Sequence, residues 1–226
     1  EISEYLNKVY GENTVEYAMH VGGQEPGMHD ARNDPQLGVH FVADPAPGKH
    51  TIGSALNYSG MSLSDICTWA PAVIKHKKSE EYVPSHEEAM KSVANSCYSM
   101  LTDAVGGCFY AEIMGVHTWN PCAYMNAANG LEKTGDEYME IGKRIQTLKQ
   151  MFNIKQGIDP ASWKMPDRMA GIPPLSYGPL KGKTLQNRDM VRYHWEGMGW
   201  NSENGIPLPE TLEQLSIAEL LALEEE

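Results

Sequence analysis

The sequence has no apolar run long enough to span a bilayer, and its start does not resemble a signal peptide. Basic residues are few: 18 Lys and Arg stand against 30 Asp and Glu, which gives a formal net charge of -12. Such an excess of negative charge repels nucleic-acid phosphates and anionic lipid headgroups. We therefore expect neither nucleic-acid binding nor membrane insertion.

Cysteines are also scarce. The chain has 4, at Cys67, Cys97, Cys108 and Cys122, and no two of them form a CxxC pair. No zinc or iron–sulfur motif is therefore complete within the chain. A disulfide framework is not expected in 226 residues of which 41% are hydrophobic, so we expect a reducing, cytoplasmic location. Walker, GxGxxG and nucleophile-elbow motifs are absent as well.

Helical periodicity is the main pattern that is present. Ser85 followed by Glu88 is typical of a capping box, and apolar residues then recur every three or four positions as far as Gly106. A second capping pair, Thr134 with Glu137, opens another such stripe, which ends with Leu148, Met151 and Phe152. These patterns predict an all-α, multihelical domain.

Shorter or less regular patterns complete this prediction. Apolar spacing favours helices over residues 187–197 and 212–221 and a less regular one over 64–74, whereas residues 39–42 alone hint at a strand. Glycine and proline concentrate in residues 22–53 and 157–183. Long loops of this kind in a compact domain usually carry function or cover a ligand.

The segment from Asp103 to Cys108 is the most informative one. Asp103 falls in the last turn of an apolar helix, where the helix dipole disfavours negative charge and a buried carboxylate needs N–H donors. A pterin ring would supply such donors, Gly106 and Gly107 would let it approach the backbone, and Cys108 could then reach a metal centre. On local grounds alone, Asp before two glycines is more typical of a turn, and a lone Cys of a small core residue.

His50 is the second candidate. It ends a loop, residues 44–50, that two prolines stiffen and Gly48 allows to turn. Because imidazole titrates near neutral pH, a histidine on a rigid loop is suited to proton transfer. The chain has 8 histidines, however, and any one of them is more often a surface or structural residue than a catalyst.

Several segments, in order, resemble one family. Asp103-Ala-Val-Gly-Gly-Cys108 is similar to the Asp-x-x-Gly-Leu-Cys motif of the aldehyde ferredoxin oxidoreductases. Further family stretches, such as Gly-x-Glu-x-Pro with His-Asp, Leu-Pro-x-Arg and Arg-Gly-Trp with Gly-x-Pro, are matched in the same order along the chain. The matching segments are 22–32, 141–157, 165–168, 197–207 and 212–217. Together they place the chain in the last third of a typical member.

The resemblance implies a set of cofactors. In the family, two molybdopterin dithiolenes hold tungsten, or sometimes molybdenum, beside a [4Fe–4S] cluster whose other cysteines come from an earlier domain. By resemblance, Cys108 is the remaining cluster ligand, Asp103 and the backbone at Gly107 hold a pterin, and His50 helps proton transfer beside the metal. The implied reaction oxidises a small aldehyde to a carboxylic acid in an anaerobic cell and passes electrons to ferredoxin or another electron-transfer protein.

The resemblance also sets the expected organisation. Residues 1–20 would end a preceding helical domain, and residues 21–226 would form the C-terminal helical cofactor-binding domain. The remainder of the same enzyme would be a partner, in a homo-oligomer or as a subunit of a complex.

Two departures from the family pattern bear on the substrate. Gly107 replaces the usual Leu, and residues 44–50 replace the common Ser-Asn-Arg-Gly-Ala-Cys-His loop. The alternatives are a related tungsten-enzyme subunit acting on another substrate, such as an aromatic acyl-CoA, a cofactor-free helical interaction module, and a degenerate member whose site is filled by side chains.

Overall fold

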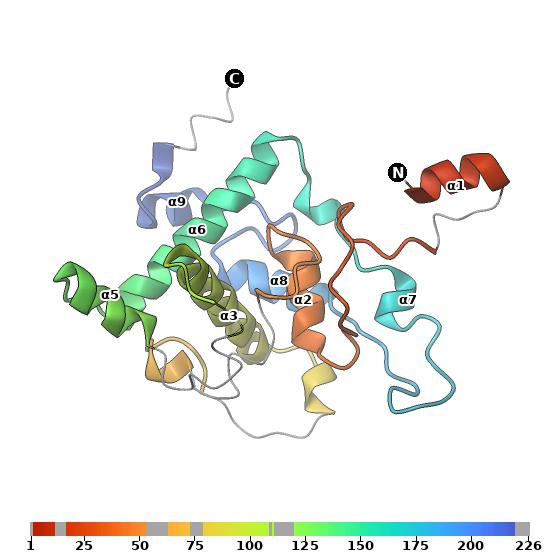
Figure 1. The fold of residues 1–226 in the computed structure, drawn as a ribbon, viewed down its shortest axis with the longest axis horizontal. Helices are drawn as coiled ribbons and strands as arrows, with labels where there is room; N and C mark the ends of the chain where they lie inside the picture. Colours follow the sequence, from red (N-terminus) through yellow and green to blue (C-terminus); the bar gives the residue numbers. More distant parts are fainter. Residues whose placement is uncertain are drawn as a thin grey trace.

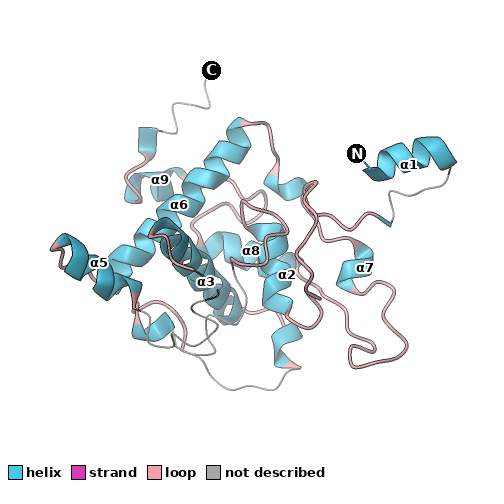
Figure 2. Ribbon diagram, viewed as in Figure 1, coloured by secondary structure: helices cyan, strands magenta, loops and turns pink. Residues whose placement is uncertain are grey.

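The structure is a computed structural model that describes residues 2–11, 17–52, 63–72, 79–108, 110 and 120–219 (Figure 1). Helices and loops make up this described part, and extended pairing in it is limited to two isolated bridges, Val21 with Gln24 and Trp200 with Pro207 (Figure 2). The prediction of an all-α, multihelical domain with long loops is thereby confirmed. Within these ranges, no helix combines the length and the apolar character that crossing a membrane requires.

The helices follow one another with long connections. In chain order they are α1 (Ile2–Tyr10), α2 (Pro35–Ala43), η3 (Leu63–Asp65), η4 (Glu80–Tyr82), α3 (His86–Ala104), α5 (Pro121–Asn129), α6 (Gly135–Lys155), η5 (Pro160–Ser162), α7 (Asp167–Ala170), α8 (Arg188–Gly197) and α9 (Pro209–Gln214). The helix α1 stands apart from the others in Figure 1. The proposed boundary after residue 20 stays a prediction.

The core forms where α3 crosses α6 and α8, with α2 packed against α8 and α3. Both predicted N-caps are present. Ser85 Oγ accepts from the Glu88 amide at 3.1 Å, and Thr134 with Glu137 closes a complete capping box. The buried tryptophans Trp195 and Trp200 belong to this core.

The inner face of α6 differs from the predicted stripe. Leu148 and Phe152 are 40% and 64% exposed, so their prediction as buried residues is wrong. The buried positions include Gln146 and Gln150, whose side-chain amides donate to Ser96 Oγ at 2.6 Å and to a backbone carbonyl at 2.8 Å. Side-chain amides can be buried when they are hydrogen-bonded. Partners on α3 and in the loop after α8 therefore allow these glutamines to occupy buried positions where the apolar pattern predicted none.

Two other local predictions are wrong. Residues 39–42 lie in the helix α2, which begins where the Asp34 carboxylate accepts from the Leu37 amide at 3.2 Å. Every residue of this helix is buried, so its sequence shows no amphipathic period from which a helix could be predicted. The predicted helix over 64–74 is replaced by the single turn η3. After this turn, the amide and the hydroxyl of Thr68 both donate to the Asp136 carboxylate, each at 2.7 Å. Residues 73 and 74 lie outside the described part.

The last helix is shorter than predicted. α9 ends at Gln214, and Leu212, Leu215 and Ile217 pack in a small cluster with Met151. The last two residues of the predicted helix, Leu220 and Leu221, lie outside the described residues.

The crossing of α3 and α6 depends on Gly142. A Cβ at this position would overlap the carbonyl oxygen of Cys97 on α3. We expect Gly142→Ala to lower the free energy of unfolding by about 2 kcal/mol or more, because neither backbone can give way without parting the helices. Chemical denaturation of the purified protein measures this. Lys155→Ala, an exposed position on the same helix, is the control, and equal stability of the two variants would contradict this close packing.

Candidate functional site

Lys49 links the two segments that hold the sequence candidates. Nζ of Lys49, the neighbour of His50, lies 3.0 Å from Oδ2 of Asp103, and the two side chains are 38% and 53% exposed. The loop of residues 44–50 is thereby tied to the end of α3. The Asp103 side chain is half exposed, and the donor beside it is the Lys49 ammonium.

The end of α3 is built so that the backbone is accessible. Gly106 has φ +73°, and a Cβ there would meet nothing within 4 Å, so the turn opens outwards. The amide of Gly107 donates to the Thr102 carbonyl at 2.8 Å, which closes the helix with a Schellman-type bond. Cys108 follows with an exposed, free thiol. Asp103, the glycine turn and Cys108 therefore form one continuous exposed surface.

The other thiols are unsuited to metal binding. Burial raises the pKa of Cys97 to about 12 and that of Cys122 to about 11, and it also raises the pKa of Cys67. Thiolates, rather than thiols, ligate metals. In the described ranges no three His, Cys, Asp or Glu side chains are grouped so as to hold a metal ion. The described part thus offers one accessible thiol, Cys108, and the other ligands of any cluster must come from elsewhere.

His50 is half-buried beside a second histidine. Its ring centroid lies 4.9 Å from that of His29, and a Cβ on Gly27 would collide with the His50 ring. Burial lowers the pKa of His50, and the nearby His29 and Lys49 lower it further. The imidazole is therefore neutral at neutral pH and able to accept a proton.

Sequence reasoning missed a buried polar cluster at the root of the His50 loop. Asp44, the first residue of that loop, is fully buried. Its Oδ2 lies 2.6 Å from Nδ1 of His40, and its Oδ1 accepts from Ser96 Oγ at 2.8 Å and lies 3.3 Å from Nε2 of His194. Ser92 Oγ bridges the far sides of the two imidazoles, at 3.1 Å from His40 and 3.0 Å from His194. The spacing of His40 and Asp44 by one helical turn was the only local signal.

This cluster keeps Asp44 ionised. Burial alone would raise the pKa of the Asp44 carboxyl, but His40 and His194 together hold it well below its usual range. Burial lowers the pKa of His194, and the contact with Asp44 only partly offsets this. A buried carboxylate surrounded by donors fixes its own position, because moving it would leave an uncompensated charge.

Backbone hydrogen bonds secure the same loop. Trp195 Nε1 donates to the Ala43 carbonyl at 3.1 Å, and Asn153 Nδ2 donates to the Pro45 carbonyl at 2.7 Å. The Gly48 amide donates to the Phe41 carbonyl at 3.2 Å. The loop is therefore held by α8, α6 and α2 before it reaches Lys49.

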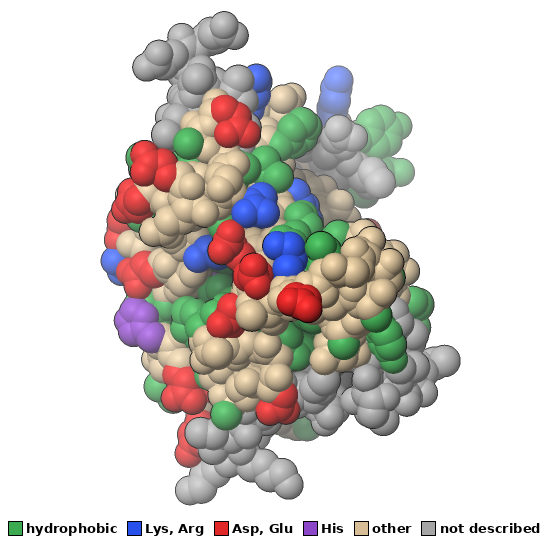
Figure 3. Space-filling model, turned by 90° about the vertical axis from the view of Figure 1, so that its left-hand side faces the viewer, with side chains coloured by type: hydrophobic (Ala, Val, Ile, Leu, Met, Phe, Trp, Pro, Cys, Tyr) green, Lys and Arg blue, Asp and Glu red, His purple; other side chains and the backbone are tan. Residues whose placement is uncertain are grey.

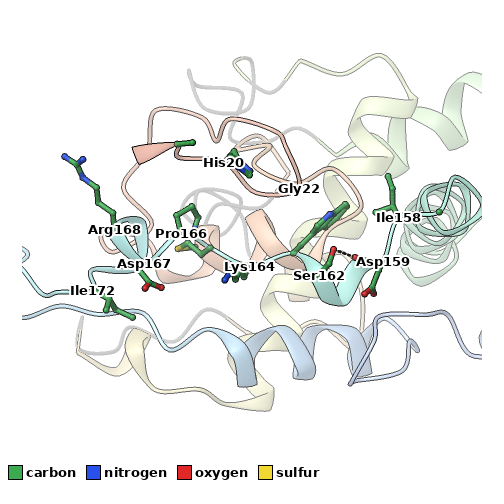
Figure 4. Close-up of a pocket in the computed structure, with 14 residues that line it drawn as sticks. His20, Gly22, Ile158, Asp159, Ser162, Lys164, Pro166, Asp167, Arg168 and Ile172 are labelled. Atoms are coloured by element: carbon green, nitrogen blue, oxygen red, sulfur yellow. Dashed lines mark hydrogen bonds between the residues drawn. The ribbon is translucent and has the colours of Figure 1, made fainter. Parts of the chain in front are cut away.

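A separate cleft of about 1100 Å³ lies between residues 18–22 and 157–172 (Figure 4). Its lining carries Asp159 and Asp167 as well as Lys164 and Arg168. Charges of both signs do not select a class of ligand. On the face shown in Figure 3, Asp and Glu side chains are scattered, with a few Lys and Arg and much uncharged surface among them, so no patch of one sign stands out on that face.

Comparison with known proteins identifies the class to which this helical architecture belongs. Residues 3–217 match the family model described as aldehyde ferredoxin oxidoreductase, domains 2 & 3. The chain belongs to this family and corresponds to its C-terminal domains.

Individual relatives are distant. A tungsten-containing aldehyde ferredoxin oxidoreductase of Thermococcus kodakarensis is 28% identical over 76% of this chain and 28% of its own length. The Pyrococcus abyssi protein of the same name is 27% identical over 92% of this chain and 32% of its own length. An aliphatic sulfonate oxidoreductase, WOR-like subunit, of Pyrococcus furiosus is 26% identical over 95% of this chain and 30% of its own length. The chain thus spans about a third or less of these relatives.

The buried cluster predicts how stability depends on pH. Folding lowers the pKa values of both Asp44 and His194. Below about pH 6.5, these two residues therefore bind protons in the unfolded chain more readily than in the folded protein. Stability is present above this range and is lost as the pH falls, first through His194 and then, near pH 4, through Asp44. We expect His194→Gln to flatten the dependence of unfolding temperature on pH between about 6.5 and 5, because glutamine does not titrate.

The exposed His86 supplies the control for this experiment. His86→Gln removes an imidazole whose side chain is 70% exposed, and it leaves the buried cluster intact. Its pH dependence should match that of the unmodified protein. Equal slopes for all three proteins would contradict a neutral, buried His194.

Proposed function

We propose that this chain is the C-terminal part of a tungsten-pterin, iron–sulfur oxidoreductase that oxidises aldehydes to carboxylic acids and passes electrons to ferredoxin. The observation that carries the proposal is the contact of Lys49 with Asp103, which brings the loop that ends at His50 to the turn that carries Gly107 and the exposed Cys108. A proton acceptor, a carboxylate, an open backbone turn and an accessible thiol are the groups that such a cofactor pair would need. Family membership supports the same assignment.

The residues present fit one wall of a cofactor site. The open turn at Gly106 leaves room for a flat ring against the backbone, and the half-exposed Asp103 can accept hydrogen bonds from N–H groups of that ring. Cys108 is exposed and unpaired, so its sulfur can ligate iron. Because the chain spans only part of its relatives' length, the opposite wall and the remaining cluster ligands would come from the rest of the enzyme.

Each residue then has a defined task. A bound tungsten-pterin and its cluster would supply two-electron oxidation and one-electron transfer. Asp103 would orient the pterin, with Lys49 holding the carboxylate in place at 3.0 Å until the ring binds. Neutral His50 would accept one of the two protons that are released, together with two electrons, when an aldehyde and a water molecule yield a carboxylic acid. The His29 ring, which lies beside it with its centroid at 4.9 Å, would restrict the orientation of the His50 ring.

A second candidate function has a specific observation in its favour. The relative named as an aliphatic sulfonate oxidoreductase, WOR-like subunit, aligns with 95% of this chain. The loop of residues 44–50 departs from the pattern expected by resemblance at the place where a substrate would bind. Oxidation of an organic sulfonate, by this chain as part of a subunit in a larger complex, is therefore the alternative substrate assignment.

The substrate assignment is tested with the complete protein produced anaerobically with tungstate. We expect dye or ferredoxin reduction with short aldehydes and much slower reduction with alkane sulfonates or an aromatic acyl-CoA. Tungsten and iron content are measured on the same preparation. A tungsten-loaded protein that reduces the acceptor only with a sulfonate would replace the aldehyde assignment.

The role of Cys108 is tested by a matched pair of variants. Cys108→Ala should lower the iron content and electron transfer about tenfold or more, because a cluster that loses a thiolate ligand is labile. Cys122→Ala, which removes a buried thiol, should retain both. Iron analysis and acceptor reduction on the complete protein measure the outcome, and full iron content in the Cys108→Ala protein would refute cluster ligation by this thiol.

A further inference from the structure

The His50 ring lies where two loops meet. One is its own loop, residues 44–50, and the other is the glycine-rich loop of residues 22–32. The Gly27 amide donates to the Gly48 carbonyl at 3.1 Å, which joins the two loops two residues before His50. A Cβ on Gly48 would meet the backbone of the other loop at 3.1 Å, so the two chains pass each other closely. The position of one loop therefore restricts the other.

Gly27 forms one side of a slot for the His50 ring. A Cβ built on Gly27 would lie 2.2 Å from Nδ1, 2.5 Å from Cγ and 2.8 Å from Cβ of His50. These three atoms are its nearest neighbours, so the imidazole occupies the space that a side chain at position 27 would need. The φ angle of Gly27 lies outside the left-handed region, and its backbone therefore does not require glycine. The close approach of the His50 ring is what excludes a side chain.

His29 supplies a second contact with the same ring. The two ring centroids are 4.9 Å apart and the ring planes are tilted by 34°. The His29 amide donates to the Gly27 carbonyl at 2.6 Å, so a single tight turn carries both residues. His29 itself is exposed, whereas His50 is half-buried. The turn thus covers part of the His50 ring and leaves its own imidazole in solvent.

The chain that follows this turn is fixed to the helical body. The Asp30 carboxylate accepts from the amide and from Nε of Arg32, each at 2.9 Å. The Tyr82 hydroxyl donates to the Arg32 carbonyl, and Ala31 is buried in the main core cluster. His29 is therefore held beside His50 by its neighbours in the chain.

We propose that Gly27 and His29 are positioning residues that fix the orientation of the His50 imidazole. A neutral imidazole accepts a proton only through the lone pair of one ring nitrogen, so the direction of the ring decides which group it can reach. The task of His50 as a proton acceptor rests on the proposed function, whereas the slot that holds its ring does not.

The slot is tested by the reactivity of His50 toward diethyl pyrocarbonate in the complete protein, read by peptide mass spectrometry. At about pH 8, where exposed imidazoles are neutral, we expect Gly27→Ala and His29→Ala each to raise the modification rate of His50 about threefold or more. The first variant displaces the ring and the second uncovers it. Met28→Ala is the control, because this side chain lies between the two positions and is fully exposed. Unchanged rates in both variants would overturn the slot.

The metal-loaded complete enzyme shows whether the orientation matters. We expect Gly27→Ala and His29→Ala each to lower kcat about tenfold with a largely unchanged KM, because a misplaced proton acceptor slows the reaction without altering the binding surface. Tungsten and iron content should stay the same. His29→Phe keeps a flat ring and should restore most of the kcat that His29→Ala loses. If His29→Phe is as slow as His29→Ala, the ring nitrogens of His29 are required and the positioning role is overturned.

A protein without the His50 ring separates positioning from a general effect on the fold. In a His50→Ala background, His29→Ala should not lower the residual kcat further, because no ring is left to hold. A further loss would overturn an action through His50. Complete protein that takes up no tungsten in any form would instead refute the proposed function, while the modification rates of His50 would still decide on the slot.

Discussion

The candidate site depends on one buried carboxylate. Asp44 has no contact with solvent, yet it lies where α2 ends and the loop to His50 begins. An isolated ionised carboxylate is very costly to bury, so it is stable only while its hydrogen-bond donors surround it. Those donors come from α3 and from α2 itself, and His194 of α8 lies 3.3 Å from the same carboxylate. The packing of three helices and the path of the loop that ends at His50 thus meet at the same group.

The consequence is a division between a rigid root and an exposed end. At the root, Asp44, the carbonyls of Ala43 and Pro45 and the amide of Gly48 all have partners in the helical body. At the exposed end of the loop, Lys49 pairs with the half-exposed Asp103, and the His50 ring lies beside the His29 ring. Functional groups held on a secured scaffold keep their geometry with little cost of reorganisation when a ligand binds. This part of the chain is suited to present one wall of a site that another part completes.

Local rules predicted some of these features from the sequence. The caps at Ser85 and Thr134 and the glycine turn after α3 act between neighbouring residues, so α3 and α6 could be recognised without a structure. The resemblance of the segment ending in Cys108 likewise gave the family, which the family model confirms. The roles of His50, Asp103, Gly107 and Cys108 stay predictions.

Other features arise only from contacts between distant residues. From the sequence, Asp44 was only the first residue of a loop, and His40 and His194 were two histidines among eight, because the contacts of the cluster join residues as far apart as positions 40 and 194. The burial of the glutamines of α6 likewise depends on partners that apolar periodicity does not report, namely Ser96 of α3 and a carbonyl of the loop after α8. An experimental density map of the complete, metal-loaded protein tests the central claim most directly. The account predicts iron bonded to Sγ of Cys108 and a pterin facing Asp103, whereas a sulfur without iron and an Asp103 still paired only with Lys49 would contradict it.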